Sequence, residues 1–208
     1  MLGLLFDGEN SEIQSSMAKV RDNRVGRMER IINRLNEAGI EIKMSDVEAE
    51  RRDGATLGRP HLADALVKKG VAKNRDEVFS NFLHNNSKFY IPHYSPRPIE
   101  VIKMIKNAGG VAIIAHPFAS LRGQTISEES FSELVAAGLD GIEIEHRDHN
   151  HEERELLLKI AHEFDLVTTG SSDYHGEGKL NTLAEFTTSP DQWEKLEARA
   201  SERRVVRK

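Results

Sequence analysis

Between residues 24 and 108, the apolar side chains recur at the three- and four-residue spacing of amphipathic helices. The first run of this kind ends at Gly39, and glycine favours helix termination. Later helix starts are marked by the capping-box spacing of Ser45 and Glu48, by Pro60 in a first turn, and by Asn74 followed by Glu77. A last helix in this half is predicted from about residue 99 to Gly109.

From Gly110 onward the pattern alternates between short apolar runs and helices. Residues 111–115 (VAIIA), 141–145 (GIEIE) and 166–169 (LVTT) have the character of buried parallel strands. Helices are predicted after Ser127, from about Glu152 to Phe164, and from Ser189 onward. This alternation predicts an α/β fold with parallel strands, and residues 2–6 (LGLLF) offer one more strand.

The composition is that of an ordinary globular chain, and it limits the possible chemistry. The 208 residues carry a formal charge of −5 and contain no cysteine, which excludes disulfides and thiolate metal sites. The charge also argues against a surface that binds nucleic acid over its whole extent. The opening residues lack the features of a signal peptide, and no apolar run is long enough to span a membrane. We therefore expect a cytoplasmic protein.

Each predicted strand of the second half ends in residues that titrate or bind metals. His116 follows the first strand, and Asp173 and His175 follow the third. Because active residues of βα folds come from the carboxyl ends of strands, these side chains are expected to converge. Imidazole and carboxylate ligands together suit Zn²⁺, Mn²⁺ or Fe²⁺. The second strand is followed by a further cluster: Glu145, His146, Asp148, His149 and His151.

Simpler interpretations exist for each of these residues. His116 taken alone is as consistent with a surface or hydrogen-bonded histidine, and Asp173 with a turn cap. Part of the segment from His146 to His151 can equally begin the next helix, where acidic residues suit the dipole. It is the coincidence of three strand ends that favours a metal site.

A second candidate site lies in the helical half, at Gly58-Arg59-Pro60-His61. An arginine and a histidine at a helix N-terminus can form a corner that binds phosphate. An exposed helix start is the alternative. We expect structural roles for other notable residues, and a solvated helix end for the basic tail: His84, His93, His162 and Trp193 in the first group, and Arg199, Arg203, Arg204, Arg207 and Lys208 in the second.

Four ordered motifs carry a family resemblance: GRPHLADALVKKG, GGVAIIAHP, GIEIEHRDHN and TGSSDYHG. They resemble the later motifs of PHP-family (polymerase and histidinol phosphatase) metal-dependent phosphoesterases. Within that family they are most similar to the branch that removes phosphate from nucleotides or trims RNA from its 5′ end. The resemblance implies a distorted βα barrel with a helical insertion. Residues 1–20 and 99–208 would be the C-terminal part of the barrel, and residues 21–98 the insertion that caps the active site.

The resemblance also implies roles for individual residues. His116 matches the metal-binding histidine of an Ala-His-Pro motif, and Asp173 and His175 match a terminal Asp-x-His pair. These three would be both metal ligands and catalytic residues. The metal would be Mn, Zn, Fe or Mg. Arg59 and His61 match a motif of the insertion that contacts substrate phosphate, and His146 and His149 fall in a segment near the substrate.

The sequence departs from the family pattern at its beginning. The family opens with a His-x-His motif, followed by an Asp-His pair, a bridging glutamate and a histidine before a Leu-Gly strand. The opening MLGLLFD resembles the segment directly after that last histidine. We therefore expect an N-terminally truncated barrel with an impaired metal site, and a chain that is unstable or associates.

Three functions stay open from the sequence. The first is a metal-dependent phosphoesterase acting on a phosphorylated small molecule, a nucleotide or short RNA. The second is a catalytically inactive phosphate-binding, nucleotide-binding or regulatory module. The third is a nucleic-acid-binding protein that uses the insertion and the basic tail, for which RNA affinity would fall steeply with salt. An oligomer is compatible with all three.

Overall fold

The computed structural model describes residues 1–51, 55, 57–120, 125–174 and 181–201. The chain forms two compact units. The first, here called the sheet unit, comprises Met1–Gln14 and Pro96–Lys208, and the second, the helical unit, comprises Ser15–Ser95. The sequence predicts a helical insertion at residues 21–98 that caps an active site. Its role as a cap stays a prediction.

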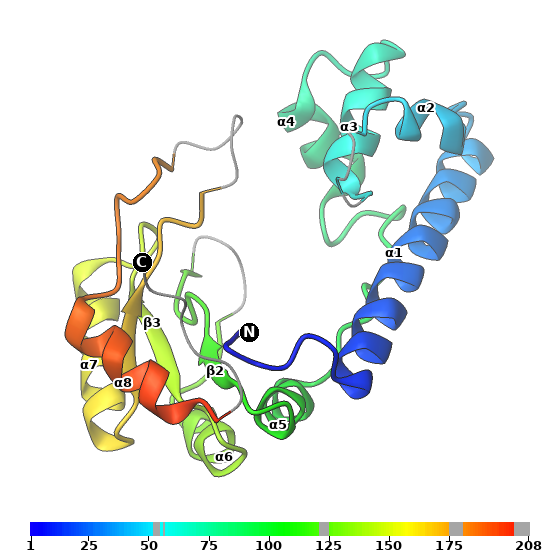
Figure 1. Cartoon of the computed structure of the whole chain (residues 1–208). Helices are drawn as coiled ribbons and strands as arrows, with labels where there is room; N and C mark the ends of the chain where they lie inside the picture. Colours follow the sequence, from blue (N-terminus) through cyan, green and yellow to red (C-terminus); the bar gives the residue numbers. More distant parts are fainter. Residues whose placement is uncertain (52–54, 56, 121–124, 175–180, 202–208) are drawn as a thin grey trace. The chain divides into compact units, whose positions relative to one another are not determined.

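A four-stranded sheet forms the centre of the sheet unit (Figure 1). Its strands are arranged in the order β1 (Leu2–Leu4), β2 (Val111–Ile114), β3 (Gly141–Glu145) and β4 (Val167–Gly170). The pairs β2–β3 and β3–β4 are parallel, as the alternating pattern predicts, whereas β1 runs antiparallel to β2. Mixed α/β architecture is therefore confirmed.

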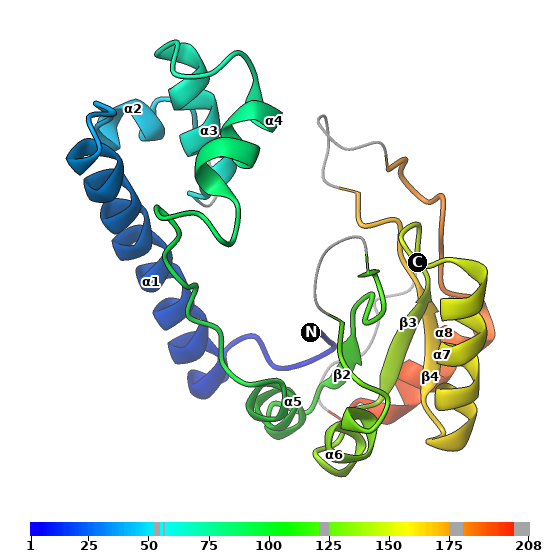
Figure 2. The same cartoon turned by 180° about the vertical axis from the view of Figure 1, so that it is seen from behind.

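Helices cover both faces of this sheet. Alternate residues along β2 point to opposite faces: Ala112 and Ile114 join one hydrophobic cluster, while Val111 and Ile113 join another. The first cluster is completed by α5 (Pro98–Asn107), α6 (Ser130–Ala136) and α7 (His151–Glu163), and the second by α8 (Pro190–Arg199). Figures 1 and 2 show α8 on one side of the strands and α7 on the other.

Asp140, directly before β3, ties several of these elements together. Its carboxylate accepts hydrogen bonds from the Ala112 N–H at 2.8 Å and from Lys106 Nζ at 2.8 and 2.9 Å. Its carbonyl oxygen accepts from Val167 N–H and from Arg199 Nη1. One residue thus connects β2, β4, α5 and α8 at the amino end of the parallel strands.

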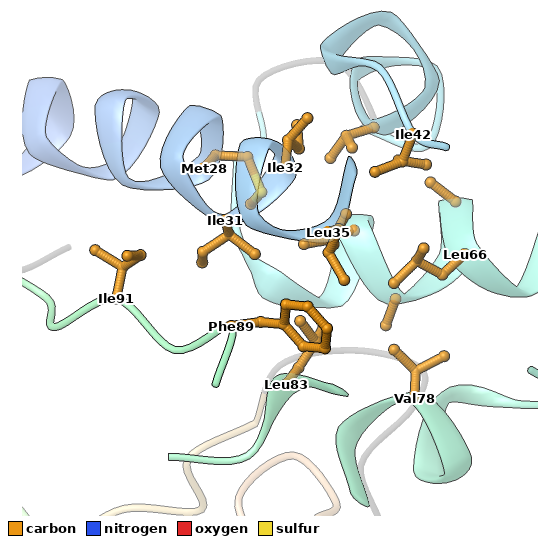
Figure 3. Packing of buried hydrophobic residues seen from close by; sticks show 14 of the residues in the cluster. Met28, Ile31, Ile32, Leu35, Ile42, Leu66, Val78, Leu83, Phe89 and Ile91 are labelled. Atoms are coloured by element: carbon orange, nitrogen blue, oxygen red, sulfur yellow. The ribbon is translucent and has the colours of Figure 1, made fainter. Parts of the chain in front are cut away.

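The helical unit has its own hydrophobic core (Figure 3). Its elements are most of α1 (Ser11–Glu37), then α2 (Met44–Glu48), α3 (Arg59–Lys68), α4 (Arg75–Val78) and a π-helical turn, Phe79–Leu83. In the close-up, α1 contributes Ile31 and Leu35, which face Leu66 of α3 and the ring of Phe89. These four side chains are almost completely buried.

Three helix starts differ from the sequence prediction. Helix α1 begins at Ser11, because the Asn10 side chain accepts hydrogen bonds from the N–H groups of Glu12 and Ile13. Its first turns are largely exposed, so they lack the repeat of apolar residues from which a helix is predicted. Helix α2 is capped by the Asp46 carboxylate, which accepts from Lys43 N–H, and not by a Ser45–Glu48 box. Helix α6 begins at Ser130, after a turn in which Ser130 N–H donates to the Ser127 carbonyl.

No helix in the described ranges is both long enough and apolar enough to cross a membrane.

Replacement of Asp140 by alanine is expected to lower the free energy of unfolding of the sheet unit by about 3 kcal/mol, because it leaves Ala112 N–H and Lys106 without their acceptor. Urea denaturation followed by circular dichroism measures this change. The matched control is Glu194→Ala, since Glu194 is exposed on α8. Equal stability of the two variants would contradict the role given to Asp140.

Candidate functional site

His116 stands at the carboxyl end of β2, one residue beyond Ala115. Its backbone has a φ of +32°, a region that residues other than glycine rarely occupy. The imidazole ring lies 5.0 Å from the ring of His146, centroid to centroid, which places the ends of β2 and β3 side by side. The predicted convergence of His116 with the segment after β3 is therefore present in the structure.

Glu143 fixes the backbone of His116. This carboxylate is in the middle of β3, only 2% of the residue is exposed, and its Oε2 accepts a hydrogen bond from His116 N–H at 2.8 Å. The pairing of β3 with β4 is irregular between Glu143 and Glu145, as at a β-bulge. Sequence analysis did not select Glu143. The available signal was a charged residue in the middle of a strand whose other central positions are apolar and buried.

His146 and His149 belong to the turn that leads from β3 to α7. His146 is fully buried, and its Nδ1 accepts a hydrogen bond from Asp148 N–H at 3.0 Å. His149 is also buried, and its ring bridges two backbone groups: Nδ1 lies 2.8 Å from the Ile144 carbonyl oxygen, and Nε2 accepts from Phe118 N–H at 3.3 Å. With Nδ1 as the donor, the ring is a neutral imidazole.

This arrangement gives His149 an architectural role in addition to the predicted one. It links the end of β3 to the residues that follow His116. Contact between His149 and a substrate stays a prediction, and such contact would require one of the two ring bonds to be given up. The turn then ends at Asn150, whose side chain accepts from Glu153 N–H and caps α7.

Asp173 follows β4 in a turn and has a φ of +49°. Its N–H donates to Ser171 Oγ at 3.2 Å, and Ser171 N–H donates in turn to the Glu145 carbonyl. Gly170 precedes this turn at a point where a Cβ atom would lie 2.5 Å from the Thr187 carbonyl oxygen, so only glycine fits. His175, the third predicted ligand, lies outside the described residues.

The donor types at this edge suit a divalent metal, since imidazole and carboxylate are its usual protein ligands without cysteine. Within the described part of the chain, however, no three His, Asp or Glu side chains are close enough together to hold an ion. The described residues therefore form part of a ligand set at most.

Two arginines, Arg147 in the β3–α7 turn and Arg154 on α7, contact residues near this edge. Arg154 on α7 donates from Nη2 to the His146 carbonyl at 2.8 Å and lies over the Phe186 ring. Arg147 Nη1 lies 3.7 Å from a carboxylate oxygen of Glu185. The hydrogen bond from Thr182 N–H, with smaller contributions from Arg147 and His146, lowers the pKa of the Glu185 carboxyl group. Glu185 and Phe186 thus lie against the β3–α7 turn and the first part of α7.

Arg59 and His61 both lie in the first turn of α3, within the helical unit. His61 Nδ1 accepts a hydrogen bond from Gly58 N–H at 3.1 Å and so helps to begin the helix. Arg59 Nη1 donates to the Leu83 carbonyl and to Asn85 Oδ1. The structure brings these two residues together, and their contact with phosphate stays a prediction.

Of the four residues expected to have structural roles, three form hydrogen bonds or packing contacts and one is exposed. His84 Nδ1 accepts from Asn86 N–H, His93 Nε2 accepts from Arg24 Nε, and Trp193 packs against the cluster on the α8 face. His162 is exposed on α7. In the basic tail, Arg199 donates to the carbonyl oxygens of Asp140 and Asp165, and the tail bases after Ser201 lie outside the described residues.

Comparisons with known proteins agree with the motifs. The chain is 40% identical to a protein of known structure from Bifidobacterium adolescentis described as a metal-dependent phosphoesterase, with a TM-score of 0.87, and covers 70% of it. It is 26% identical over 179 residues to a 3′,5′-nucleoside bisphosphate phosphatase of Chromobacterium violaceum, and 30% identical over 177 residues to a 5′-3′ exoribonuclease of Haemophilus influenzae. These matches cover 86% and 84% of this chain, and it spans 63% of either relative. No protein-family model matches it.

Glu143→Ala is expected to lower the free energy of unfolding by about 1–3 kcal/mol, because the partly buried N–H of His116 loses its acceptor. Glu143→Gln keeps an acceptor oxygen and should recover most of this loss. Urea denaturation measures both variants. Glu145→Ala, at the exposed end of the same strand, serves as the control and should change stability by less than about 1 kcal/mol. An alanine variant as stable as the glutamine variant would refute the role given to Glu143.

Proposed function

This chain belongs to the PHP family of metal-dependent phosphoesterases, and we propose that it hydrolyses phosphate esters of nucleotides or short RNA with the help of a divalent metal. One observation supports this most directly: His116, His146 and Asp173 follow parallel strands and so lie at the same edge of the sheet. The substrate class is inferred from relatives that act on nucleoside bisphosphates and on RNA.

The activity of the whole protein is part of this proposal. The chain spans between 54% and 63% of the length of the first three curated relatives it matches. In the same sense we propose that residues 1–20 and 99–208 correspond to part of a distorted βα barrel, with residues 21–98 as a cap. The parallel strands with intervening helices and the separate helical core support this assignment.

His116, Asp173 and His175 are the residues proposed to hold the metal. A bound divalent ion would lower the pKa of a coordinated water and stabilise charge on a phosphoryl oxygen. The chain's own residues prepare the site. Glu143 holds the backbone of His116 in its left-handed conformation, and the Ser171 hydroxyl holds that of Asp173, so both side chains emerge from turns of fixed geometry.

The remaining predicted residues would bind and orient substrate. His146 is buried next to His116. The hydrogen bond that its Nδ1 accepts from Asp148 N–H holds the imidazole in one orientation. The ring of His149 connects the turn after His116 to the end of β3, which precedes His146. Arg59 and His61 are proposed to bind the substrate phosphate from the helical unit.

A second candidate function is a catalytically inactive module that binds phosphate or nucleotides. The observation that favours it is the pair Arg59 and His61 in the first turn of α3, an arrangement that can bind phosphate without a metal. This candidate predicts nucleotide binding that is unaffected by chelators and by replacement of His116.

His116→Ala is expected to reduce phosphate release by about a hundredfold or more in kcat/KM, since even indirect supports of metal ligands are worth ten- to a hundredfold. The measurement is phosphate release from adenosine 3′,5′-bisphosphate with added Mn²⁺, before and after EDTA. EDTA should abolish the activity and Mn²⁺ should restore it.

The matched control is His162→Gln, which changes an exposed histidine of α7 and should leave turnover unchanged. Turnover that persists in EDTA, or in the His116 variant, would reject a metal-dependent phosphoesterase centred on His116. Complete lack of turnover in the unmodified chain, together with nucleotide binding in EDTA, would favour the inactive module.

A further inference from the structure

An open groove of about 530 Å³ lies in the helical unit beside the middle of α1. We call it the α1 groove, and its lining consists of five residues of α1 and one tyrosine: Lys19, Asp22, Asn23, Gly26, Arg30 and Tyr94. The five helical positions lie three, four, seven and eleven residues after the first of them, so they share one face of α1.

Gly26 lines the α1 groove without a side chain, and packing does not explain the glycine. Among the described residues, a Cβ atom at this position would meet no neighbouring side chain or segment within 4 Å. Glycine is also the least favourable residue of a helix interior after proline, and Gly26 lies well inside a helix of 27 residues. The glycine therefore keeps open a space that neither helix formation nor packing requires.

Tyr94 places an exposed aromatic ring at the same groove. It belongs to the segment that runs back along α1 after the π-helical turn (Figures 1 and 2), and 44% of the residue is exposed. Its backbone is fixed to the helix, because Tyr94 N–H donates to Asn23 Oδ1 at 3.1 Å. An exposed ring on a fixed backbone is the kind of platform on which nucleobases stack in proteins that bind single strands.

The two cations of the α1 groove stand far apart. Lys19 and Arg30 are eleven residues apart, which corresponds to about 16 Å along the helix axis. Both are exposed, and neither forms an ion pair with another described residue. Two cations at this separation suit two different phosphates of one strand better than a single phosphate.

The surrounding charge favours a polyanion. Residues 19–34 of α1 include six basic residues and two acidic ones, so this part of the helix is positive although the whole chain carries −5. A local surplus of positive charge raises the concentration of anionic ligands near it.

Asp22 and Asn23 lie between the two cations along the helix and suit the base or the ribose. The Asp22 carboxylate repels a phosphate, but it can accept a hydrogen bond from the amino group of a base. Asn23 Nδ2 can donate to an oxygen of a base or a ribose. Cations at both ends, hydrogen-bonding groups between them and an aromatic ring beside them match a nucleic acid strand better than an isolated anion.

We propose that the α1 groove binds the body of a single-stranded RNA, through contacts that do not include its terminal phosphate. Tyr94 stacks on a base, Lys19 and Arg30 contact two phosphates, and the open space at Gly26 admits the strand. The choice of RNA rests on the proposed function, whereas the preference for a single strand rests on the groove itself.

The test is fluorescence anisotropy of the whole chain in EDTA with a labelled RNA of about ten nucleotides, a length within the site sizes of proteins that bind single strands. The RNA carries a 5′-hydroxyl group in place of a terminal phosphate. The unmodified chain should bind it more tightly than a duplex of the same sequence. Tyr94→Ala should weaken binding by about tenfold, as expected for the loss of one stacked base, and Tyr94→Phe should retain it.

Gly26→Gln tests the open space directly. The new side chain should fill the groove and weaken RNA binding by about tenfold, while the melting temperature stays the same or rises because glutamine is the better helix former. The matched control is Val25→Gln, which introduces the same side chain at the adjacent exposed position outside the lining and should change affinity by no more than about twofold.

Salt dependence tests the phosphate contacts. Lys19→Gln should reduce the slope of log affinity against log salt concentration by about 0.7, as for the loss of one phosphate contact on a single strand. Arg21→Gln removes the same charge from an exposed position of α1 outside the lining and should change the slope by less.

Equal effects of Gly26→Gln and Val25→Gln, or of Lys19→Gln and Arg21→Gln, would overturn the proposal, as would failure of the unmodified chain to bind the RNA. Tighter binding of the duplex would overturn the preference for a single strand. Equal binding of DNA of the same sequence would overturn the choice of RNA.

This assay needs neither turnover nor a metal, so it separates the inference from the proposed function. If phosphate release is absent but RNA binding responds to the groove variants as described, the α1 groove stands and the hydrolytic function falls. If phosphate release from a nucleotide is normal but the groove variants bind RNA as the unmodified chain does, the reverse holds.

Discussion

The carboxylate of Asp140, buried where β3 begins, accepts hydrogen bonds from β2 and from α5, while the carbonyl of the same residue binds β4 and α8. A parallel sheet needs such a point because its strands are joined by long connections and no hairpin sets their register. With the amino ends of three strands fixed by one residue, their carboxyl ends come to the same edge. The placement of the candidate site depends on that alignment.

Glu143, in the middle of β3, supports a strained backbone at the carboxyl end of β2, much as Asp140 supports the amino ends of the strands. His116 and Asp173 both have positive φ values, which cost roughly 1–3 kcal/mol each for residues other than glycine. The hydrogen bonds that His116 N–H donates to Glu143 and Asp173 N–H donates to Ser171 Oγ hold these conformations in place. Strain of this kind is concentrated at functional sites, and here it falls on two of the residues proposed to bind the metal.

Much of the fold could be predicted from the sequence because burial leaves a clear pattern. The strand at 141–145 was predicted with its observed bounds, since an apolar run begins at a glycine and ends at exposed charges. The start of α1 was missed because its first turns are exposed and give no apolar repeat. Glu143 was missed because its role depends on a hydrogen bond with His116, which lies 27 residues away in the chain. The sequence does not show that these two residues are in contact. For the same reason the architectural contacts of His149, to residues in two different turns, could not be predicted.

The helical unit buries one hydrophobic cluster and the sheet unit buries two, and the chain passes between the units at residues 14–15 and 95–96. Neither cluster borrows side chains from the other. During evolution, substitutions in one core can therefore accumulate without compensation in the other. A lineage can remodel the helical unit, or exchange it for another helical module, while the strands and the edge proposed to hold the metal are inherited unchanged. Substrate preference and hydrolytic chemistry would then diverge at separate rates.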